Sequence, residues 1–288
     1  MEGIIVKGIA GFYYVKVDNE IIECKARGKF RHTELTPMVG DRVKIAMQGK
    51  KGVIEGVNQR SSELLRPPVA NVTQAYVIFT LKDPDLNLDL LNRFIILCEF
   101  NNIRPIICFN KVDLADINEL NTTAEMFEKA SYQVHYLNAR EGIGLSHLEN
   151  MLEDNVTVLC GPSGVGKSTI LNRLTGKELM KTGEISEKLG RGKHTTRHCE
   201  LIEVYKGYIV DTPGFSSLSM DFITKEKLQL CFPEFDDHMD NCKFTGCMHY
   251  KEPSCAVKEA VEDKIIAKER YDFYVKTLEE ILNGRNKR

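Results

Sequence analysis

The 288-residue sequence has no long hydrophobic run, and none of its stretches approaches the ~18 uncharged apolar residues that a membrane helix needs. The opening residues, MEGIIVKG, lack the charged start, apolar core and small-residue cleavage site of a secretory signal. Charge of one sign is not in excess either, because 39 Lys and Arg residues face 41 Asp and Glu residues. The chain as a whole is therefore not typical of a polyanion binder, and we expect a cytoplasmic protein, monomeric and without a membrane partner.

The cysteine pattern does not indicate a disulfide framework, since nine cysteines are an odd number. Six of them are scattered through apolar or mixed segments, as is typical of reduced thiols in a reducing compartment: Cys24, Cys98, Cys108, Cys160, Cys199 and Cys231. The other three cluster near the C-terminus and need a separate explanation.

The first 66 residues are rich in short segments of Val, Ile and Tyr separated by Gly or Asp-Asn, which predicts β-strands. The predicted strands are Ile4–Ile9, Phe12–Val17, Ile21–Cys24, Arg42–Met47 and Gly52–Val57. Five short strands suit a small closed barrel of the oligonucleotide-binding (OB) type. An SH3-like barrel has almost the same signature, so the strand pattern leaves both open.

The periodicity changes after Arg66-Pro67-Pro68, which is typical of a linker or domain edge. From residue 67 to about 220, apolar runs alternate with helical patterns, which predicts a mostly parallel sheet covered on both faces. The predicted strands are Ala75–Leu81, Pro105–Phe109, Val134–Leu137, Val156–Cys160 and Tyr208–Val210, and the helices are Leu88–Asn101, Asn118–Ala130 and Leu145–Glu153. Residues 221–288 look helical over Lys225–Cys231 and over the long, charged stretch Ala256–Asn283.

A phosphate-binding motif follows the strand Val156–Cys160, since residues 161–168 match G-x-x-x-x-G-K-[ST] at every fixed position. Its glycines allow successive backbone N–H groups to curl around phosphates, and the helix that follows adds its dipole. Lys167 supplies a positive charge to the β- and γ-phosphates, and the Ser168 hydroxyl can bind Mg²⁺. The nucleotide-binding residues predicted here are Gly161, Pro162, Ser163, Gly164, Val165, Gly166, Lys167, Ser168 and Thr169.

A D-x-x-G segment, Asp211-Thr-Pro-Gly214, comes directly after the apolar strand Tyr208–Val210. The Asp211 carboxylate at a strand end is well placed to hold Mg²⁺, directly or through water. Gly214 can bring a backbone N–H to the γ-phosphate.

The motif Asn110-Lys111-Val112-Asp113 ends the strand Pro105–Phe109 and is the N-K-x-D pattern of guanine recognition. A carboxylate at Asp113 can accept two hydrogen bonds from the guanine ring N–H and amine, a pair that adenine does not offer. Lys111 can lay its aliphatic stem over the base, and Asn110 can tie neighbouring loops together. The following loop, residues 136–145, resembles S-A-x-x-G-x-G-L with Asn138 in place of Ser, and the backbone amide of Ala139 is expected to contact the guanine carbonyl.

Three cysteines and one histidine lie within fourteen residues, in the pattern Cys242-x4-Cys247-x-His249-x5-Cys255. Three thiolates and an imidazole are a standard set for tetrahedral Zn²⁺. Because four protein ligands leave no open position for water, we expect one structural zinc ion per chain.

The base motif precedes the phosphate motif, whereas ordinary G domains have the reverse order. With this order the chain resembles the circularly permuted ribosome-assembly GTPases of the RsgA/YjeQ/YloQ type over essentially its full length. The resemblance is carried by NKVD, GPSGVGKS, GRGKHTTRH, DTPGF and the Cys/His cluster, whose spacing matches the family pattern. It implies a multidomain α/β protein with an OB-like barrel (1–66), a circularly permuted P-loop GTPase domain (67–220) and a C-terminal helical zinc-binding domain (221–288).

The resemblance also implies GTP hydrolysis to GDP, stimulated by the small ribosomal subunit and acting late in its maturation. Phe215 stands where many G domains have a catalytic Gln, so another group must orient the attacking water. The best candidates lie in the loop Gly190–His198, where Thr195 or Thr196 can bind Mg²⁺ and His194 can position water. For His194, contact with RNA or solvent is the alternative.

Contact with ribosomal RNA is inferred from the barrel, the basic run Lys25–His32 and the zinc module. Two other function classes stay open on sequence alone. One is a P-loop enzyme of metabolism such as a kinase, and the other is an RNA-binding module whose nucleotide site is vestigial.

Overall fold

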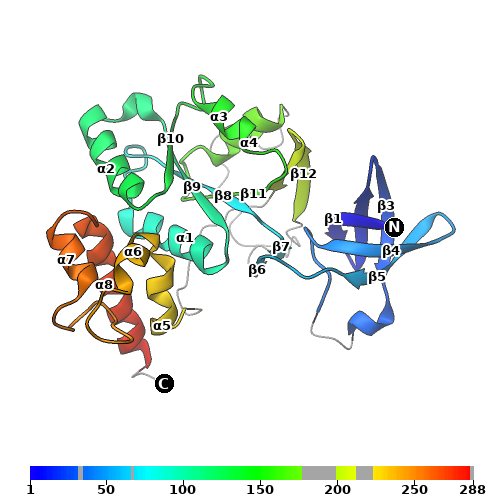
Figure 1. Ribbon diagram of the computed structural model, residues 1–288. Coiled ribbons are helices and arrows are strands. Elements are labelled where there is room, and N and C mark those ends of the chain that lie inside the picture. Colours follow the sequence, from blue (N-terminus) through cyan, green and yellow to red (C-terminus); the bar gives the residue numbers. More distant parts are fainter. Residues whose placement is uncertain (32–34, 66–67, 177–198, 212–222, 286–288) are drawn as a thin grey trace.

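The computed structural model describes residues 1–31, 35–65, 68–176, 199–211 and 223–285, and these form three parts in a row. Figure 1 shows a β-barrel at the N-terminal end, a central sheet with helices, and a helical C-terminal part packed against the central one. Among the described helices, none combines the length and apolar character that a bilayer-spanning segment needs.

The N-terminal barrel has the five strands expected, with bounds that differ by a few residues at most. They are β1 (Glu2–Ile9), β2 (Phe12–Val17), β3 (Glu20–Ala26), β4 (Arg42–Gln48) and β5 (Lys51–Val57), with a short 3-10 helix η1 (Gly28–Arg31) after β3. Val43 and Ile45 point into the barrel core and alternate with exposed Arg42 and Lys44, as the period of two requires. The barrel closes because β1 pairs with both β2 and β4, while β3 runs parallel to β5. This is the OB arrangement, not the SH3-like one.

The segment expected to be a linker is ordered on both sides of residues 66–67, which lie outside the described part. It contains a two-stranded hairpin, β6 (Glu63–Leu65) and β7 (Pro68–Ala70). Arg60 fixes the segment to the barrel, because its guanidinium forms two hydrogen bonds of 2.8 and 2.9 Å with the fully buried carboxylate of Asp41. The proline that opens β7 is compatible with a strand because it occupies the first position of an edge strand.

The central part is a sheet whose first five strands are parallel, in the order β10-β9-β8-β11-β13, followed by antiparallel β12. Its strands are β8 (Gln74–Phe79), β9 (Arg104–Asn110), β10 (Gln133–Leu137), β11 (Val156–Cys160), β12 (Glu200–Val204) and β13 (Gly207–Asp211). Five of these strands, all except β12, match a strand predicted from an apolar run. The strand β11 has the predicted bounds, whereas β8 ends at Phe79, two residues before the predicted end at Leu81. The edge strand β12 pairs with β1 at Lys7–Glu200, which joins the barrel to this sheet.

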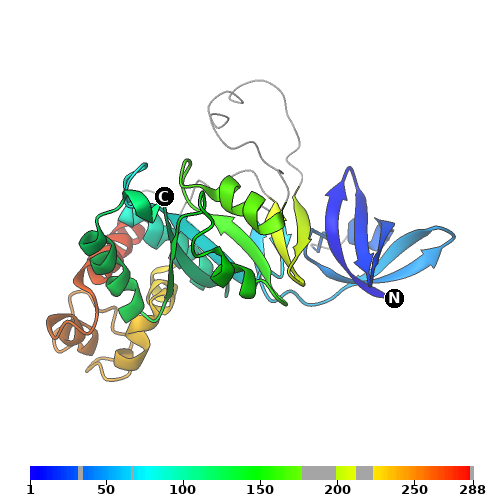
Figure 2. The same cartoon turned by 90° about the horizontal axis from the view of Figure 1, so that it is seen from above.

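Helices cover both faces of the central sheet, as Figure 2 shows. They are α1 (Leu88–Phe100), α2 (Ile117–Lys129), α3 (Leu145–Asn150) and α4 (Lys167–Thr175), with the 3-10 helix η2 (Val112–Leu114) before α2. Successive side chains of β8 point to opposite faces of the sheet. Val77 packs in the core with α1 and α2, whereas Ile78 packs in the core with α3 and α4. The continuous apolar runs of the sequence therefore reflect strands that are buried on both sides.

The C-terminal part packs a set of short helices on the outer side of α1, whose Ile96 belongs to the C-terminal core. Its elements are α5 (Lys225–Leu228), η3 (Gln229–Cys231), η4 (Pro233–Phe235), α6 (Asp236–Met239), α7 (Ala256–Glu262) and α8 (Lys268–Arg285). The expectation of helix throughout Ala256–Asn283 is wrong, because the chain turns between α7 and α8. Lys264 has a positive φ of 61°, and the N–H groups of Ile265 and Ile266 both donate to the carbonyl of Ala260. Burial of Ile266 stabilises this turn.

Candidate nucleotide site and metal cluster

The two nucleotide motifs meet at one edge of the central sheet. The base motif follows β9 and the phosphate motif follows β11, and the parallel strand β8 lies between them. Carboxyl ends of parallel strands share one edge, which is where open α/β sheets bind ligands. The tertiary fold thus brings together motifs that the chain presents in inverted order.

The phosphate loop has a backbone that requires glycine at two positions. Gly161 has a φ of +136°, and a Cβ there would collide with the carbonyl oxygen of Ile78 in β8. Gly166 has a φ of +97°, and a Cβ there would collide with the side-chain amide of Asn110. Both positions combine left-handed backbone with close approach of a neighbour, so side chains are excluded for two reasons.

Lys167 begins helix α4, and its ammonium lies within the phosphate loop. Nζ donates to the carbonyl oxygens of Gly161 at 2.8 Å and Pro162 at 2.5 Å. Burial lowers the pKa of Lys167, because a buried ammonium loses hydration. A phosphate placed at the N-terminus of α4 would compensate this loss with a direct negative charge.

Asn110 connects the two motifs directly. Its amide nitrogen donates to the carbonyl of Val165 in the phosphate loop at 2.8 Å, and its Oδ1 accepts from the backbone N–H of Ala139 at 3.0 Å. The side chain is 4% exposed, so both bonds are shielded from water. Three loops from three strand ends are therefore held together by one amide, as the sequence predicted for this residue.

The rest of the base motif turns outward. Lys111 has left-handed backbone (φ 58°), after which Val112 and Asp113 form the 3-10 helix η2. The Asp113 side chain is exposed, which leaves its carboxylate accessible to a ligand. The Lys111 ammonium contacts Asp83, a residue of the β8–α1 loop that sequence reasoning missed. The available signal was its position just after a buried strand, at the same sheet edge as the motifs.

The loop after β10 owes its shape to Asn138, which stands where the pattern has Ser. Asn138 is buried, and its backbone pairs with Ile143, while its side chain accepts a hydrogen bond from the N–H of Glu141. This arrangement presents the neighbouring Ala139 amide to Asn110. A guanine carbonyl would have to share that N–H with Asn110.

Several predicted residues fall outside the described part of the chain. They are His194, Thr195, Thr196, Gly214 and the side chain of Asp211. The backbone of Asp211 is described and ends β13, which runs parallel to β11. Asp211 thus follows the strand beside the one that leads into the phosphate loop, and its role in binding Mg²⁺ stays a prediction.

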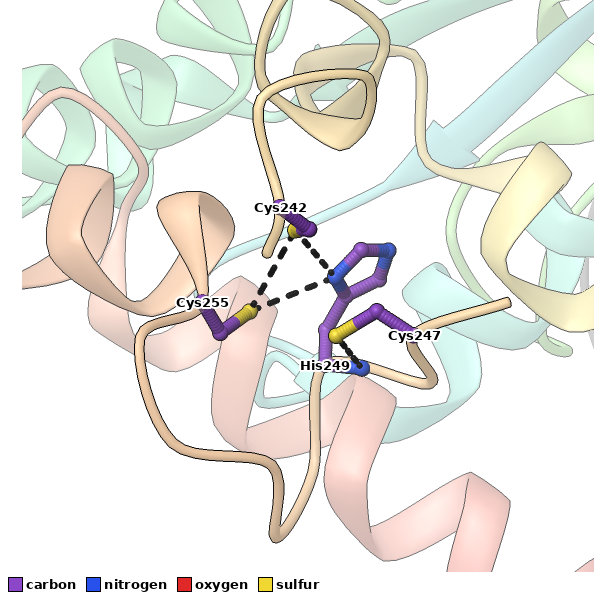
Figure 3. A group of neighbouring side chains, drawn as sticks. All are labelled: Cys242, Cys247, His249 and Cys255. Atoms are coloured by element: carbon purple, nitrogen blue, oxygen red, sulfur yellow. Dashed lines mark hydrogen bonds between the residues drawn. The ribbon is translucent and has the colours of Figure 1, made fainter. Parts of the chain in front are cut away.

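The four predicted metal ligands form one cluster, drawn in Figure 3, with all ligand atoms within 4.8 Å of one another. The Cys242 and Cys255 sulfurs are 3.8 Å apart, and Nδ1 of His249 lies 3.5 and 3.3 Å from them. A tetrahedral ion with metal–sulfur bonds of about 2.3 Å and a metal–nitrogen bond of about 2.0 Å needs edges of about 3.8 and 3.5 Å. The cluster can therefore hold a metal ion in tetrahedral geometry. Without an ion, burial raises the pKa of Cys255 to about 12, so binding would release protons.

Two tyrosines of α8 fix the loop that carries His249. Tyr271 donates to the carbonyl of His249 at 2.7 Å, and Tyr274 donates to the carbonyl of Met248 at 2.6 Å. The Glu252 carboxylate accepts from two further N–H groups of the same loop. The ligand loop is thus tied to the final helix by side-chain bonds that do not depend on the metal.

A buried arginine, which the sequence pattern did not reveal, forms an ion pair inside the C-terminal part and a hydrogen bond with α1. Arg270 of α8 is 0% exposed and forms hydrogen bonds of 2.7 and 3.1 Å with Glu234 and of 2.7 Å with Asn92 of α1. Its guanidinium stacks on Phe232 at 4.8 Å and on Tyr132 at 5.4 Å. Planar Arg is suited to this because it bonds a carboxylate in its plane and packs on rings above it.

Comparison with known families gives two matches along the chain. The model of the RsgA N-terminal domain matches residues 2–54, and the model of the RsgA GTPase matches residues 57–221. The two matched stretches correspond to the barrel and to the hairpin and central sheet that follow it.

Individual relatives resemble the chain over its full length. The small ribosomal subunit biogenesis GTPase RsgA of Clostridium perfringens is 61% identical over 99% of both chains, and that of Clostridium botulinum is 60% identical over 100% of both. Among solved structures, YloQ, described as a circularly permuted GTPase, has a TM-score of 0.85 at 39% identity and covers 98% of this chain and 95% of its own. YjeQ from Thermotoga maritima has a TM-score of 0.84 at 36% identity and 98% coverage of both. The geometry of the site and these likenesses agree, and the chain belongs to the RsgA GTPase family, the circularly permuted GTPases.

Proposed function

We propose that the chain binds GTP across the phosphate loop and the base motif, hydrolyses it to GDP, and acts in maturation of the small ribosomal subunit. The observation that carries the nucleotide site is the Asn110 bridge between Val165 and Ala139. It holds the phosphate-binding and base-reading loops at a fixed separation, which a single bound nucleotide requires. The names of the relatives supply the ribosomal part of the proposal.

In this proposal the guanine base lies between the stem of Lys111 and the loop that contains Ala139. The exposed carboxylate of Asp113 accepts hydrogen bonds from the ring N–H and the exocyclic amine of guanine. With adenine in the site, the carboxylate would lack both partners. At the other end, α4 and the backbone of the phosphate loop hold the phosphates, and the Lys167 ammonium neutralises their charge. A kinase-type reaction has no use for the base motif, so GTP hydrolysis is favoured.

Mg²⁺, when bound with GTP, would offset the negative charge that develops on the phosphates. We assign it to the Ser168 hydroxyl and the Asp211 carboxylate, with Thr195 or Thr196 completing the site. His194 is proposed to orient the attacking water, because Phe215 cannot do so. Gly214 would donate its N–H to the γ-phosphate.

We propose that the ion in the Cys242–Cys255 cluster is zinc, since a Cys₃His set at tetrahedral distances suits it and all four positions are filled by protein. Its role is structural. The sulfurs and Nδ1 of His249 would become thiolate and neutral imidazole ligands, and the ordered loop would present its exposed neighbours to a partner.

The RNA contact of the proposal is assigned to the barrel and the zinc module. On the barrel, the ammonium groups of Lys25 and Lys51 lie 5.0 and 5.8 Å from the ring centroid of Phe12. In the zinc module, Lys243 lies over the exposed ring of Phe244. Aromatic faces next to Lys side chains suit a single-stranded or looped polyanion, which binds by stacking and by phosphate contact.

The test is the GTPase rate with and without purified small ribosomal subunits, at several salt concentrations. We expect slow intrinsic turnover and strong stimulation by the small subunit, with less stimulation as salt rises. Large subunits serve as the control. Equal rates in all three conditions would refute the ribosomal part of the proposal while leaving GTP hydrolysis in place.

The catalytic assignment needs its own variant. His194→Ala is expected to retain GTP affinity and to lose stimulated turnover by about 10²-fold or more, the typical contribution of a group that positions or accepts a proton. His198→Ala in the same basic run is the matched control. If His194→Ala keeps stimulated turnover, His194 has no role in hydrolysis.

A further inference from the structure

The loop between β8 and α1, residues 80–87, lies between the two nucleotide motifs and has no role in the proposals above. It begins at the carboxyl end of β8, the strand that separates β9 from β11. It is braced internally, because the Thr80 hydroxyl donates to the carbonyl of Pro84 at 2.6 Å and the Leu86 N–H donates to the carbonyl of Leu81. We call it the 80–87 loop.

The 80–87 loop lies next to the phosphate loop at Pro84. A Cβ built on Gly164 would lie 3.6 Å from Cδ of Pro84, so the proline ring lies beside the phosphate loop at Gly164, with room for about one carbon atom between them. Asp83 is the residue immediately before this proline, so it lies close to the phosphate loop.

On its other side the 80–87 loop holds the lysine of the base motif. Nζ of Lys111 donates to the Asp83 carbonyl at 2.5 Å and lies 3.2 Å from its carboxylate Oδ2. The Lys111 side chain is only 28% exposed, whereas that of Asp83 is 81% exposed. The aliphatic stem of Lys111 therefore spans the distance from the base motif to the 80–87 loop, with its charged end fixed at Asp83.

We propose that Asp83 is a positioning residue for the guanine base, because it fixes the ammonium of Lys111 so that the lysine stem forms one face of the base pocket. The inference rests on the proposed nucleotide site and deepens it. A free lysine side chain loses rotamer freedom when it packs on a ligand, whereas an anchored one has already lost it. Asp83 thus acts on affinity through Lys111, without touching the base.

This role differs in kind from that of Asp113. Asp113 reads the edge of the base, so its contribution depends on the exocyclic amine of guanine. The Lys111 stem lies against the face of the ring, and contact with a ring face does not depend on that amine. Loss of Asp83 should therefore weaken the binding of GDP and of IDP by the same factor, because guanine and the hypoxanthine base of IDP differ only in that amine.

The experiment measures dissociation of mant-GDP and mant-IDP from the full chain by stopped flow. Asp83 has a positive φ of 53°, so the variant is Asp83→Asn, because Asn tolerates left-handed backbone. It is combined with Lys111→Met, which keeps an apolar stem and removes the ammonium. Asp85→Asn, which removes an exposed carboxylate from the same loop, is the control.

We expect Asp83→Asn to speed dissociation about two- to fivefold for both nucleotides, the range for a partly exposed charged contact. In the Lys111→Met background the same change should have no effect, and Asp85→Asn should have none in either background. An equal effect of Asp83→Asn in both backgrounds would overturn the inference in favour of a loop-folding role. If the wild type binds mant-GDP and Asp83→Asn has no effect on dissociation, the inference about Asp83 is overturned, while the proposed nucleotide site stands. No saturable mant-GDP binding by the wild type would overturn the nucleotide site itself.

Discussion

The metal cluster gathers four side chains from one stretch of fourteen residues, whereas the nucleotide site gathers loops that are distant in the sequence, and the two sites use different atoms. In the cluster, four side-chain atoms converge within 4.8 Å, and two tyrosines and a glutamate brace the loop that carries them. In the described part of the nucleotide site, a ligand meets the backbone of the phosphate loop, the Lys167 ammonium and the exposed carboxylate of Asp113. The four side chains of the cluster would fill every coordination position of a tetrahedral ion. The backbone groups at the sheet edge, by contrast, leave the site open, so that bound ligands can exchange.

The two sites also differ in how they connect to the rest of the molecule. The permuted order places the C-terminal part directly after the Asp211–Gly214 segment. If that segment moves when the γ-phosphate is lost, as we propose, the movement would reach the C-terminal part through the chain. The structure adds a second connection, because Arg270 anchors α8 to Asn92 of α1. Helix α1 contacts the sheet on one side and the C-terminal core on the other. A movement of the C-terminal part that follows a change of the bound nucleotide would therefore have to overcome the buried contact between Arg270 and Asn92.

The largest expected effect separates the two sites outright. Removing the metal with a chelator, or replacing Cys255 with Ser, should cost on the order of 10 kcal/mol of folding free energy in the C-terminal part. Nucleotide binding by the central sheet should remain. Metal content, urea unfolding and mant-GDP affinity measured on the same samples check this. Cys231→Ser, a buried cysteine of the same part outside the cluster, should keep full metal content.

The next largest effect concerns the joint between the two regions. Arg270→Met should lower the free energy of unfolding by about 3–5 kcal/mol, because the Glu234 side chain, 3% exposed, would keep an unpaired charge. Adding Glu234→Leu should recover a large share of the loss. Lys268→Met breaks an exposed ion pair on the same helix and should cost less than about 1 kcal/mol. Equal losses of unfolding free energy for Arg270→Met and Lys268→Met would mean that the buried contacts of Arg270 stabilise the protein no more than an exposed ion pair does.

Within the nucleotide site, Asn110→Ala removes the bridge between the loops. It should weaken GDP affinity by about 1–3 kcal/mol, the cost of leaving the Ala139 N–H and the Val165 carbonyl without partners. The metal content and the unfolding of the C-terminal part should not change. Titration with mant-GDP measures the effect, and Asn121→Ala, an exposed position of α2, is the matched control. An unchanged affinity would show that the loops keep their separation without Asn110.

The smallest effect is expected where the barrel meets the edge of the central sheet. Lys7 and Glu200 form an ion pair of 2.5 Å across β1 and β12, with side chains 33% and 43% exposed. Lys7→Ala should cost less than about 1 kcal/mol, and the difference should shrink as salt rises. Lys44→Ala breaks an exposed ion pair with Glu2 between two strands of the barrel and is the control. A salt-independent loss of several kcal/mol would mean that this joint is as firm as the one at Arg270.

Much of the fold followed from local pattern. The strand Val156–Cys160 was predicted with its observed bounds, because an apolar run bounded by polar residues and a glycine loop has few alternatives. The error in the C-terminal helix arose because helical charge patterning continues through residues 263–267. The turn there depends on burial of Ile266 and on left-handed backbone at Lys264, neither of which local propensity reveals. The choice between OB and SH3-like barrels required the parallel pairing of β3 with β5.

The sequence by itself determined the chemistry. Each motif carries its own residue types within a few positions, so the roles of Lys167, Asp113 and the Cys/His set could be predicted without knowing the fold. Only the tertiary structure decided which of these groups meet. Strand order, which depends on contacts between residues far apart in the chain, placed β8 between the two motifs and gave Asn110 its partners. The same long-range packing buried Arg270 and set Asp83 against Lys111. In the sequence, Asn92, Arg270 and Asp83 are single polar residues outside any motif, so their partners cannot be predicted from local pattern.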